Sequence, residues 1–253
     1  MPNRKIIFIG ETWLDIFFKD SQPTHSSIGG CIVKIAETFA SKGITPILLT
    51  EIGNDSIGKK INAKLISLGV DTGYADLYAS KTSIVLRPEG GEPSRYDLPG
   101  PDEGFDITWP RIEKEDLIVV GGHIAIDQRV RGRLWSFLTN CKDRKATIVY
   151  IPDVNDPRIQ RITRVMPTIF ENLEIADLVI TLPGDLRTLY GHDDADRAFK
   201  NNLEFYCQGA ICLAADEAGA ISAKAFGNFT APTLGQNGDP AQCIASILSA
   251  IPS

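Results

Sequence analysis

The spacing of apolar residues predicts alternating strands and helices over most of the chain. Residues 5–9 form a short apolar run that ends at Gly10, which is typical of a buried parallel strand. From Cys31 to Lys42 apolar residues recur every three or four positions, which predicts an amphipathic helix that ends at Gly43. The same reasoning predicts strands at 46–50, 117–120, 146–151, 177–181, 210–214 and 220–223, and helices at 56–68, 129–139, 161–173, 183–189, 196–206 and 239–251.

Repeated strand–helix units predict a three-layer α/β/α fold with a mostly parallel sheet covered on both faces. Near the middle of the chain the pattern changes to short alternating strands at 74–78, 82–86 and 94–98, which predicts an antiparallel β insert at about 73–101. We interpret residues 1–253 as a single α/β domain that carries this insert. Ligands of such sheets bind beyond the carboxyl ends of the strands, so chemistry is expected in the loops after residues 9, 120, 151 and 181.

Composition and charge narrow the class of protein. The net charge of −6 argues against a nucleic-acid partner. No apolar run reaches the roughly 20 residues that span a bilayer, and the first apolar run is too short for a secretory signal, so we expect a cytoplasmic protein with no membrane partner. The five cysteines include no Cys-x-x-Cys pair and are predicted to be buried free thiols. The three histidines are too scattered to predict a metal site.

Two candidate binding motifs lie in the first 30 residues. Asp15 closely follows the first strand, and a carboxylate there can accept hydrogen bonds from adjacent sugar hydroxyl groups. Gly29 and Gly30 precede the helix that begins at Cys31, where paired glycines let a ligand approach the backbone closely. The alternatives are a solvated loop aspartate and an ordinary loop.

Two further motifs lie beside later elements. Residues 153–158 (Asp-Val-Asn-Asp-Pro-Arg) place polar side chains after a strand, although a turn before a helix is equally consistent. Residues 235–240 (Gly-Gln-Asn-Gly-Asp-Pro) open the last helix. Their backbone N–H groups can bind a phosphoryl group, and Asp239 can accept a proton from an attacking hydroxyl. The alternative for Asp239 and Pro240 is an ordinary helix cap.

Three common enzyme signatures are missing from the sequence. No Gly-x-Gly-x-x-Gly follows a strand, which argues against a Rossmann dinucleotide site. There is no Walker A motif, and no Gly-x-Ser-x-Gly of an α/β-hydrolase.

The order and spacing of the motifs resemble the ribokinase-like (PfkB) carbohydrate kinases, particularly fructokinases and ketodeoxygluconate kinases. The resemblance extends over nearly the whole chain. It rests on Gly10-Glu11 with Asp15, Gly29-Gly30 with Ala36 and Gly43, residues 50–58, residues 69–72, Thr82-Ser83, residues 89–92, Arg95-Tyr96, Asp153 with Asn155, and residues 176–191.

The resemblance implies an ATP-dependent kinase that transfers the γ-phosphoryl group to a sugar hydroxyl, with Mg²⁺ as the metal cofactor. The antiparallel strands, with a further strand at 16–18, would form a lid over the sugar and pair two subunits as a homodimer. Asp239 would be the catalytic base, and no side chain is assigned as a metal ligand. The sugar would contact Asp15, Gly29, Gly30, Arg95, Asn155 and Arg158, and the phosphates or nucleotide would contact Asn237, Gly238 and Asp185. The two arginines point to a polar or anionic substrate.

The sequence also departs from the family pattern, mostly on the nucleotide side. Lys34 stands where the family has an asparagine after the paired glycines. Residues 182–185 (Leu-Pro-Gly-Asp) align with Asn-x-x-Glu, and residues 236–239 (Gln-Asn-Gly-Asp) align with Gly-Ala-Gly-Asp. Asp216 stands where the family has a glycine at the end of a strand. Only 14 residues follow Asp239, where the family adds further helices.

These departures leave three hypotheses open. An active sugar kinase explains why Asp15 and Asp239 are kept. A catalytically impaired relative, acting as a sugar-binding or regulatory protein, explains why the losses gather on the nucleotide side. A fragment of a longer kinase explains the short end but not Leu182 or Asp216. Because both aspartates survive, we expect a sugar kinase.

Overall fold

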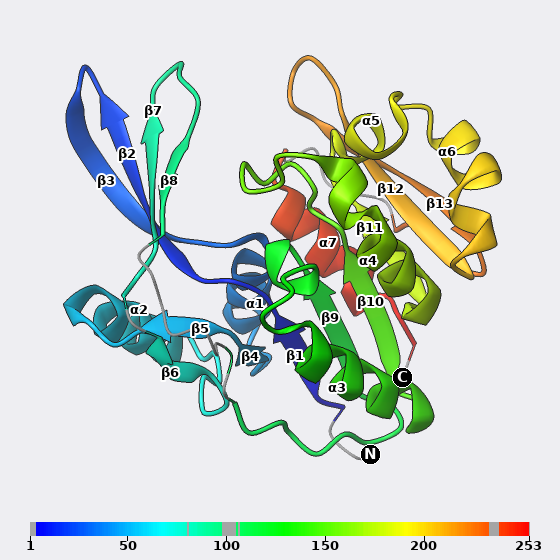
Figure 1. Ribbon diagram of the computed structural model, residues 1–253, viewed down its shortest axis with the longest axis horizontal. Coiled ribbons are helices and arrows are strands. Elements are labelled where there is room, and N and C mark those ends of the chain that lie inside the picture. The colour runs from blue at the N-terminus through cyan, green and yellow to red at the C-terminus, as the bar shows by residue number, and fades with distance from the viewer. Residues whose placement is uncertain (1–3, 80, 98–104, 106, 233–237, 253) are drawn as a thin grey trace. The chain divides into compact units, whose positions relative to one another are not determined.

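The computed structural model describes residues 4–79, 81–97, 105, 107–232 and 238–252 (Figure 1). The chain forms two compact units. Unit 1 consists of Met1–Ile7 and Arg111–Ser253, and unit 2 of Phe8–Pro110. The assignment of residues 1–253 to one domain stays a prediction.

The main sheet has the strand order β13-β12-β11-β10-β9-β1-β4. Strands β9 to β12 are parallel, and β13 is antiparallel to β12. The central strands β9, β10 and β11 are mostly apolar and are buried along almost their whole length, as expected where helices cover both faces of a sheet. The strands are β1 (Ile6–Ile9), β4 (Ile47–Leu49), β9 (Leu117–Gly121), β10 (Thr147–Ile151), β11 (Leu178–Thr181), β12 (Gly209–Ala215) and β13 (Ile221–Gly227).

The helices of unit 1 complete the predicted layered α/β fold. In Figure 1, α3 and α4 lie in front of the strands of this unit and α7 lies behind them. The apolar face of the last helix, which includes Ile244 and Leu248, is buried. Pro167 lies inside α4, which continues past it. The helices are α3 (Arg131–Asp143), α4 (Ile162–Ile175), α5 (Asp185–Tyr190), α6 (Ala195–Asn201) and α7 (Pro240–Ser249), with 3₁₀ turns at His123–Ala125 and Leu203–Phe205.

Unit 2 contains two helices and two small sheets. In α1 (Cys31–Ser41), Phe39 packs its ring 5.5 Å from that of Phe8. Helix α2 (Ser56–Ser67) begins at Asp55, whose side chain accepts a hydrogen bond from Gly58 N. Strand β5 (Glu51–Gly53) pairs in parallel with β6 (Asp76–Ala79) in a two-stranded sheet.

A separate four-stranded sheet, called the lid sheet here, has the order β3-β2-β7-β8 (Figure 1). Its strands are β2 (Trp13–Lys19), β3 (Gln22–Gly29), β7 (Ile84–Pro88) and β8 (Ser94–Tyr96). Strands β2 and β3 form an antiparallel hairpin, while β2 pairs in parallel with β7.

The lid sheet corrects the predicted insert at 73–101 in two respects. The strand predicted at 74–78 lies in β6 and pairs with β5, so it is not part of the lid sheet. Half of the lid sheet comes from residues 13–29, where only a strand at 16–18 was predicted. Strand β3 was missed because most of its residues are polar and exposed, which hides the period of two. Residues 98–101, at the end of the predicted insert, lie outside the described residues.

Two expectations from composition can be compared with the structure. All five cysteines are free thiols, as predicted, and four of them are buried. Burial raises the pKa of Cys141 to about 12 and that of Cys207 to about 11, which disfavours the reactive thiolate. Among the described helices, none combines the length and the apolar character needed to cross a membrane.

Candidate active site

The predicted site residues fall into two sets, one in each unit. Unit 2 contains the four expected to bind the sugar from the N-terminal half, which are Asp15, Gly29, Gly30 and Arg95. Unit 1 contains Asn155, Arg158, Asp185, Gly238 and Asp239. Asn237 lies outside the described residues.

The carboxylate of Asp15 is held in one orientation on the lid sheet. Asp15 and Trp13 share a face of β2 because side chains alternate along a strand. Asp15 Oδ1 accepts hydrogen bonds from Trp13 Nε1 at 2.9 Å and from Arg87 Nε at 2.8 Å. The side chain is only 7% exposed, and among the described residues Oδ2 accepts no hydrogen bond. Oδ2 therefore has lone pairs left for a ligand hydroxyl.

The indole ring of Trp13 lies between Gly29 and Arg95. Gly29 pairs with Trp13 across β2 and β3, and a Cβ atom added at Gly29 would lie 2.0 Å from Trp13 Nε1. The guanidinium carbon of Arg95 lies 4.6 Å from the centroid of the Trp13 ring. Arg95 Nε also bonds both carboxylate oxygens of Asp97, at 2.8 and 2.9 Å. Three of the predicted residues thus meet around a tryptophan.

Gly30 sets the start of α1. Its φ angle is +117°, and an added Cβ atom would lie 2.1 Å from the carbonyl oxygen of Glu11. Glu11 Oε1 in turn lies 3.9 Å from Arg95 Nη2. Packing therefore explains both glycines without a ligand, and their contact with a sugar stays a prediction.

Sequence reasoning did not single out Trp13, Arg87 or Asp97. The alternation of side chains along β2 is a signal that places Trp13 beside Asp15. Nothing in the sequence indicates Arg87, because its contact with Asp15 depends on the parallel register of β2 and β7.

In unit 1, Asp239 is the N-cap residue of α7. Its Oδ1 accepts a hydrogen bond from Ala241 N at 2.9 Å, and the residue is exposed. A Cβ atom added at Gly238 would lie 2.1 Å from the carbonyl oxygen of Gly219, so the turn before α7 approaches the β12–β13 turn closely. The capping alternative is confirmed. It does not exclude a second role, because an exposed carboxylate at a helix N-terminus stands beside N–H groups that favour anions.

Asp185 joins the loops that follow β10 and β11. Its Oδ2 accepts a hydrogen bond from Leu182 N at 2.8 Å, and its Oδ1 accepts bonds from Val154 N at 3.0 Å and Asn155 Nδ2 at 3.2 Å. Asp185 is 0% exposed. Burial raises the pKa of Asp185 to about 7, and the charge of Asp153 adds to this effect, while the hydrogen bonds oppose it. A phosphate cannot touch this carboxylate unless the loops move, and its phosphate-binding role stays a prediction.

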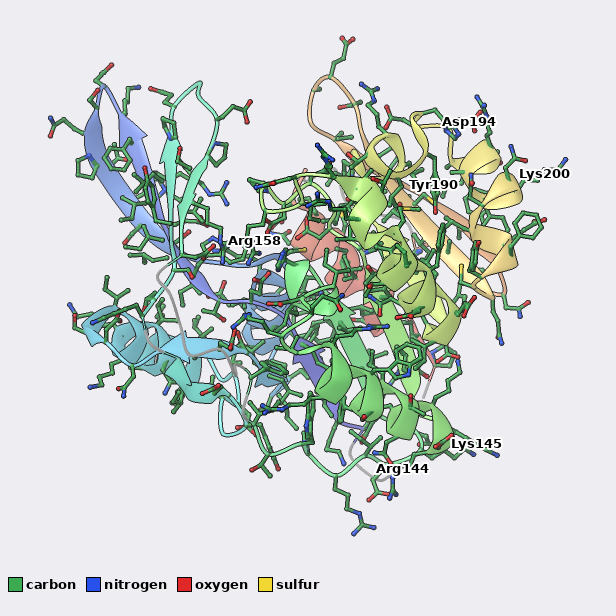
Figure 2. The ribbon with its side chains drawn as sticks, viewed as in Figure 1. Arg144, Lys145, Arg158, Tyr190, Asp194 and Lys200 are labelled. Atoms are coloured by element: carbon green, nitrogen blue, oxygen red, sulfur yellow. The ribbon has the colours of Figure 1, made fainter. Side chains whose placement is uncertain are left out.

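Asn155 and Arg158 are also held by neighbouring side chains. Asn155 Oδ1 accepts a hydrogen bond from Thr188 Oγ1 at 2.6 Å, so Asn155 bridges Asp185 and α5. Arg158, labelled in Figure 2, bonds Asp156 Oδ1 through Nε at 2.9 Å. The positive charge of Arg158 is therefore balanced by an adjacent carboxylate.

A cavity of about 590 Å³ lies beside the ends of β11 and β12 in unit 1. Its lining includes Leu182 and Gly184, which belong to the segment 182–185 that we align with the Asn-x-x-Glu motif of the kinases. Two cations also line it. Arg187 is paired with Asp193, and Lys224 with Asp196. The volume is within the range of about 300–1,000 Å³ that is typical of small-molecule sites.

The predicted metal can be compared with the side chains present. In the described part of the chain, no group of three or more His, Cys, Asp and Glu side chains is arranged to hold a metal ion. Asp185 does not fit as a direct ligand because N–H groups surround its carboxylate. Mg²⁺ at kinase sites is usually bound by one or two carboxylates together with water and substrate phosphates, so a cage made by protein alone is not required.

Comparison with known proteins supplies the family. The family model described as pfkB family carbohydrate kinase matches residues 4–205. A search of curated proteins gave no match.

Solved structures show the same fold at low sequence identity. A fructokinase from Vibrio cholerae O395, solved with fructose, ADP and calcium, has a TM-score of 0.74 and 16% identity over 88% of this chain and 73% of its own. A 2-dehydro-3-deoxygluconokinase from Thermotoga maritima has a TM-score of 0.75 and 15% identity over 89% and 77%. An aminoimidazole riboside kinase from Salmonella enterica, solved with its riboside and an ATP analogue, has a TM-score of 0.72 and 14% identity over 92% and 78%.

Proposed function

This chain belongs to the pfkB family of carbohydrate kinases, and we propose that it transfers the γ-phosphoryl group of ATP to a hydroxyl group of a sugar. The observation that carries the proposal is the exposed carboxylate of Asp239 at the N-terminus of α7. A proton acceptor at the positive end of a helix dipole, which favours anionic phosphate, suits phosphoryl transfer to an alcohol.

In the proposed reaction, Asp239 accepts the proton of the sugar hydroxyl while the hydroxyl oxygen forms a bond to the γ-phosphorus of ATP. The bond from that phosphorus to the bridging oxygen of the β-phosphate breaks, and ADP leaves with the electron pair. The N–H group of Gly238, at a position predicted to bind phosphate, and the positive end of the α7 dipole stabilise the charge on the transferred oxygens. The hydrogen bond from Ala241 N to Oδ1 orients the carboxylate for this step.

The charges near Asp15 favour a neutral sugar as the acceptor. Arg87 is bonded to Asp15, and Arg95 to Asp97, so each cation already has a carboxylate partner. An acidic sugar would have to displace one of these partners, whereas a neutral polyol needs only hydrogen-bond acceptors such as Asp15 Oδ2. We therefore propose a fructose-like substrate, as in the fructokinase solved with fructose.

ATP is proposed to bind in unit 1, with Mg²⁺ carried on its phosphates. The cavity beside β11 and β12 supports this assignment by its size and by its mainly aliphatic lining, which suits a base and ribose. When bound, Mg²⁺ would neutralise charge on the β- and γ-phosphates. The paired cations Arg187 and Lys224 lie at the same cavity, where a triphosphate would compete with Asp193 and Asp196 for them.

The test is an ADP-release assay with fructose and ATP–Mg²⁺ on wild type and Asp239→Asn. Asparagine caps a helix as well as aspartate does but accepts no proton, so we expect an unchanged fold and a kcat lower by about 10²- to 10⁴-fold. The matched control is Asp194→Asn at the N-cap of α6, labelled in Figure 2, where we expect no change in kcat. If Asp239→Asn keeps the kcat of the wild type, Asp239 is not the catalytic base.

The burial of Asp185 favours a second candidate, a catalytically impaired relative that binds sugar or regulates another protein. The position aligned with a phosphate-side glutamate is enclosed, and Leu182 cannot offer the amide that the family has there. Calorimetric titration separates the two candidates. Binding of fructose without binding of ATP–Mg²⁺ would support the impaired relative, and binding of both with turnover would exclude it.

We also propose that two copies pair through the lid sheet. Strands β3 and β8 are its edge strands, and Tyr96 on β8 is 57% exposed. Light scattering of wild type and Tyr96→Lys tests this. We expect the mass of a dimer for the wild type and a shift toward monomer for the variant, and a wild-type monomer would refute the pairing.

A further inference from the structure

Unit 2 contains a second concave site, called the basic pocket here, with a volume of about 520 Å³. It lies between the lid sheet and helices α1 and α2. Leu14 and Ile28, which are paired across β2 and β3, form part of its floor. Because neighbouring side chains on a strand point to opposite faces, the pocket lies on the other face of β2 from Asp15. It is therefore separate from the proposed sugar site.

Three lysines line the basic pocket. Lys34 comes from α1, and Lys60 and Lys64 come from α2, one helical turn apart on one face. The chain as a whole is acidic, with a net charge of −6. Lysines gathered around a concavity in an acidic protein repel one another, and an anion that enters the pocket relieves this repulsion.

Glu37 is the one carboxylate among the described residues that line the pocket. Its Oε2 lies 3.6 Å from Lys34 Nζ, whereas no carboxylate in the described residues lies within 4 Å of Lys60 Nζ or Lys64 Nζ. Three cations and one anion leave a net charge of +2. Burial raises the pKa of Glu37, and the charges of Lys34 and Lys64 oppose this effect.

The rest of the pocket is apolar apart from two serines. Ile28 and Ile61 are 8% and 4% exposed, and Leu14 and Ile57 complete the floor. The hydroxyl group of Ser26, which lies on the same face of β3 as Ile28, provides a neutral hydrogen-bond partner. A pocket lined by cations and by aliphatic side chains suits a ligand that has one anionic group and a carbon skeleton.

We propose that the basic pocket binds a small organic phosphomonoester, with its phosphate between the lysines and its carbon skeleton on the apolar floor. A phosphomonoester carries a charge of about −1.5 to −2 at neutral pH, which matches the +2 of the pocket. Ammonium groups bind phosphate as point charges with three donors each. The proposal does not depend on the kinase function, because no residue of the pocket belongs to the proposed catalytic site.

The experiment is calorimetric titration of the whole chain with phenyl phosphate, which is not a product of sugar phosphorylation. Three related compounds separate the contributions to binding. Inorganic phosphate has the head group without the carbon skeleton, and phenol has the skeleton without the phosphate. Phenyl sulfate has the same skeleton with a single negative charge. We expect saturable binding of phenyl phosphate, weaker binding of inorganic phosphate and phenyl sulfate, and none of phenol.

Charge variants assign the binding to the pocket. The double variant Lys60→Gln/Lys64→Gln should weaken phenyl phosphate binding by about tenfold or more, because it removes two cations at the ligand. Glu37→Gln removes the opposing charge and should tighten binding. The matched control Lys59→Gln changes the same helix at an exposed position that does not line the pocket, and binding should stay as in wild type.

Three results would overturn the proposal. One is the absence of phenyl phosphate binding to the wild type at millimolar concentration. Another is equal weakening in the control and the double variant, which would indicate non-specific attraction. The third is binding that the double variant leaves intact but Asp15→Asn abolishes, which would place the ligand at the sugar site.

Discussion

Replacing Asp185 with asparagine tests a buried carboxyl group whose pKa is raised to about 7. Asp185 is fully buried and accepts hydrogen bonds from two backbone N–H groups and from Asn155. Asparagine keeps the size of the side chain but cannot ionise. One of its two polar atoms must donate rather than accept, so either Leu182 N–H or Val154 N–H faces a donor. This mismatch should cost about 1–3 kcal/mol of stability at any pH.

The pH dependence follows from the raised pKa of Asp185, which is about 7 in the folded protein against about 3.9 in the unfolded chain. Because the unfolded chain releases this proton more readily, ionisation favours unfolding as the pH rises from about 4 to 7, and the effect is constant above that range. The free energy lost in this way is about 1.5 kcal/mol at pH 5 and about 4 kcal/mol at pH 8. The wild type should therefore lose about 2.5 kcal/mol relative to Asp185→Asn between these pH values.

Urea unfolding followed by circular dichroism at pH 5, 6, 7 and 8 measures this difference. Asp143→Asn is the matched control, because Asp143 is exposed at the end of α3 and should follow the wild type at every pH. If the stabilities of wild type and Asp185→Asn stay parallel from pH 5 to pH 8, burial does not hold the proton on Asp185 and the reasoning fails.

Two other predictions concern unit 2. Gly29→Ala should lower stability by about 1–3 kcal/mol and change the fluorescence of Trp13, because the new methyl group must displace the indole ring. The control Gly132→Ala has open space and should stabilise α3 by about 0.5–1 kcal/mol, so equal thermal midpoints for the two variants would contradict the packing argument. The second prediction concerns Asp55. Burial alone would raise the pKa of Asp55, but its hydrogen bonds, two of them from Thr82, lower this pKa to about 2. This stabilisation is complete above about pH 4 and is lost as the pH falls toward 2, so the wild type should be more stable than Asp55→Asn at neutral pH and should lose this advantage between pH 4 and 2. A stability difference that stays constant between pH 7 and pH 2 would contradict the argument.

The sequence determined the layered α/β fold, because that fold follows from local periodicity. Apolar runs such as 147–151 are buried on both faces of the sheet, and the stripe of α7 faces the core. The cap at Asp239 also follows from local chemistry, since the side chain reaches an N–H group only two residues away. The family resemblance rested on the same motifs, and the match over residues 4–205 confirms it.

The composition of the lid sheet depended on the tertiary structure. Residues 22–29 are too polar to show a strand period, and they form a strand because β2 offers an edge to pair with. The strand at 76–79 has ordinary strand character, and only its pairing with β5 removes it from the lid sheet.

The environments of the candidate site residues were likewise decided by contacts between distant segments. Arg87 meets Asp15 across 72 positions, and Asp185 is enclosed by a loop about 30 positions earlier. The basic pocket joins lysines from two helices that no sequence motif connects. Periodicity reports which face of an element is buried, but the partner of a side chain depends on strand register and helix packing. Those are set when many non-local contacts form together.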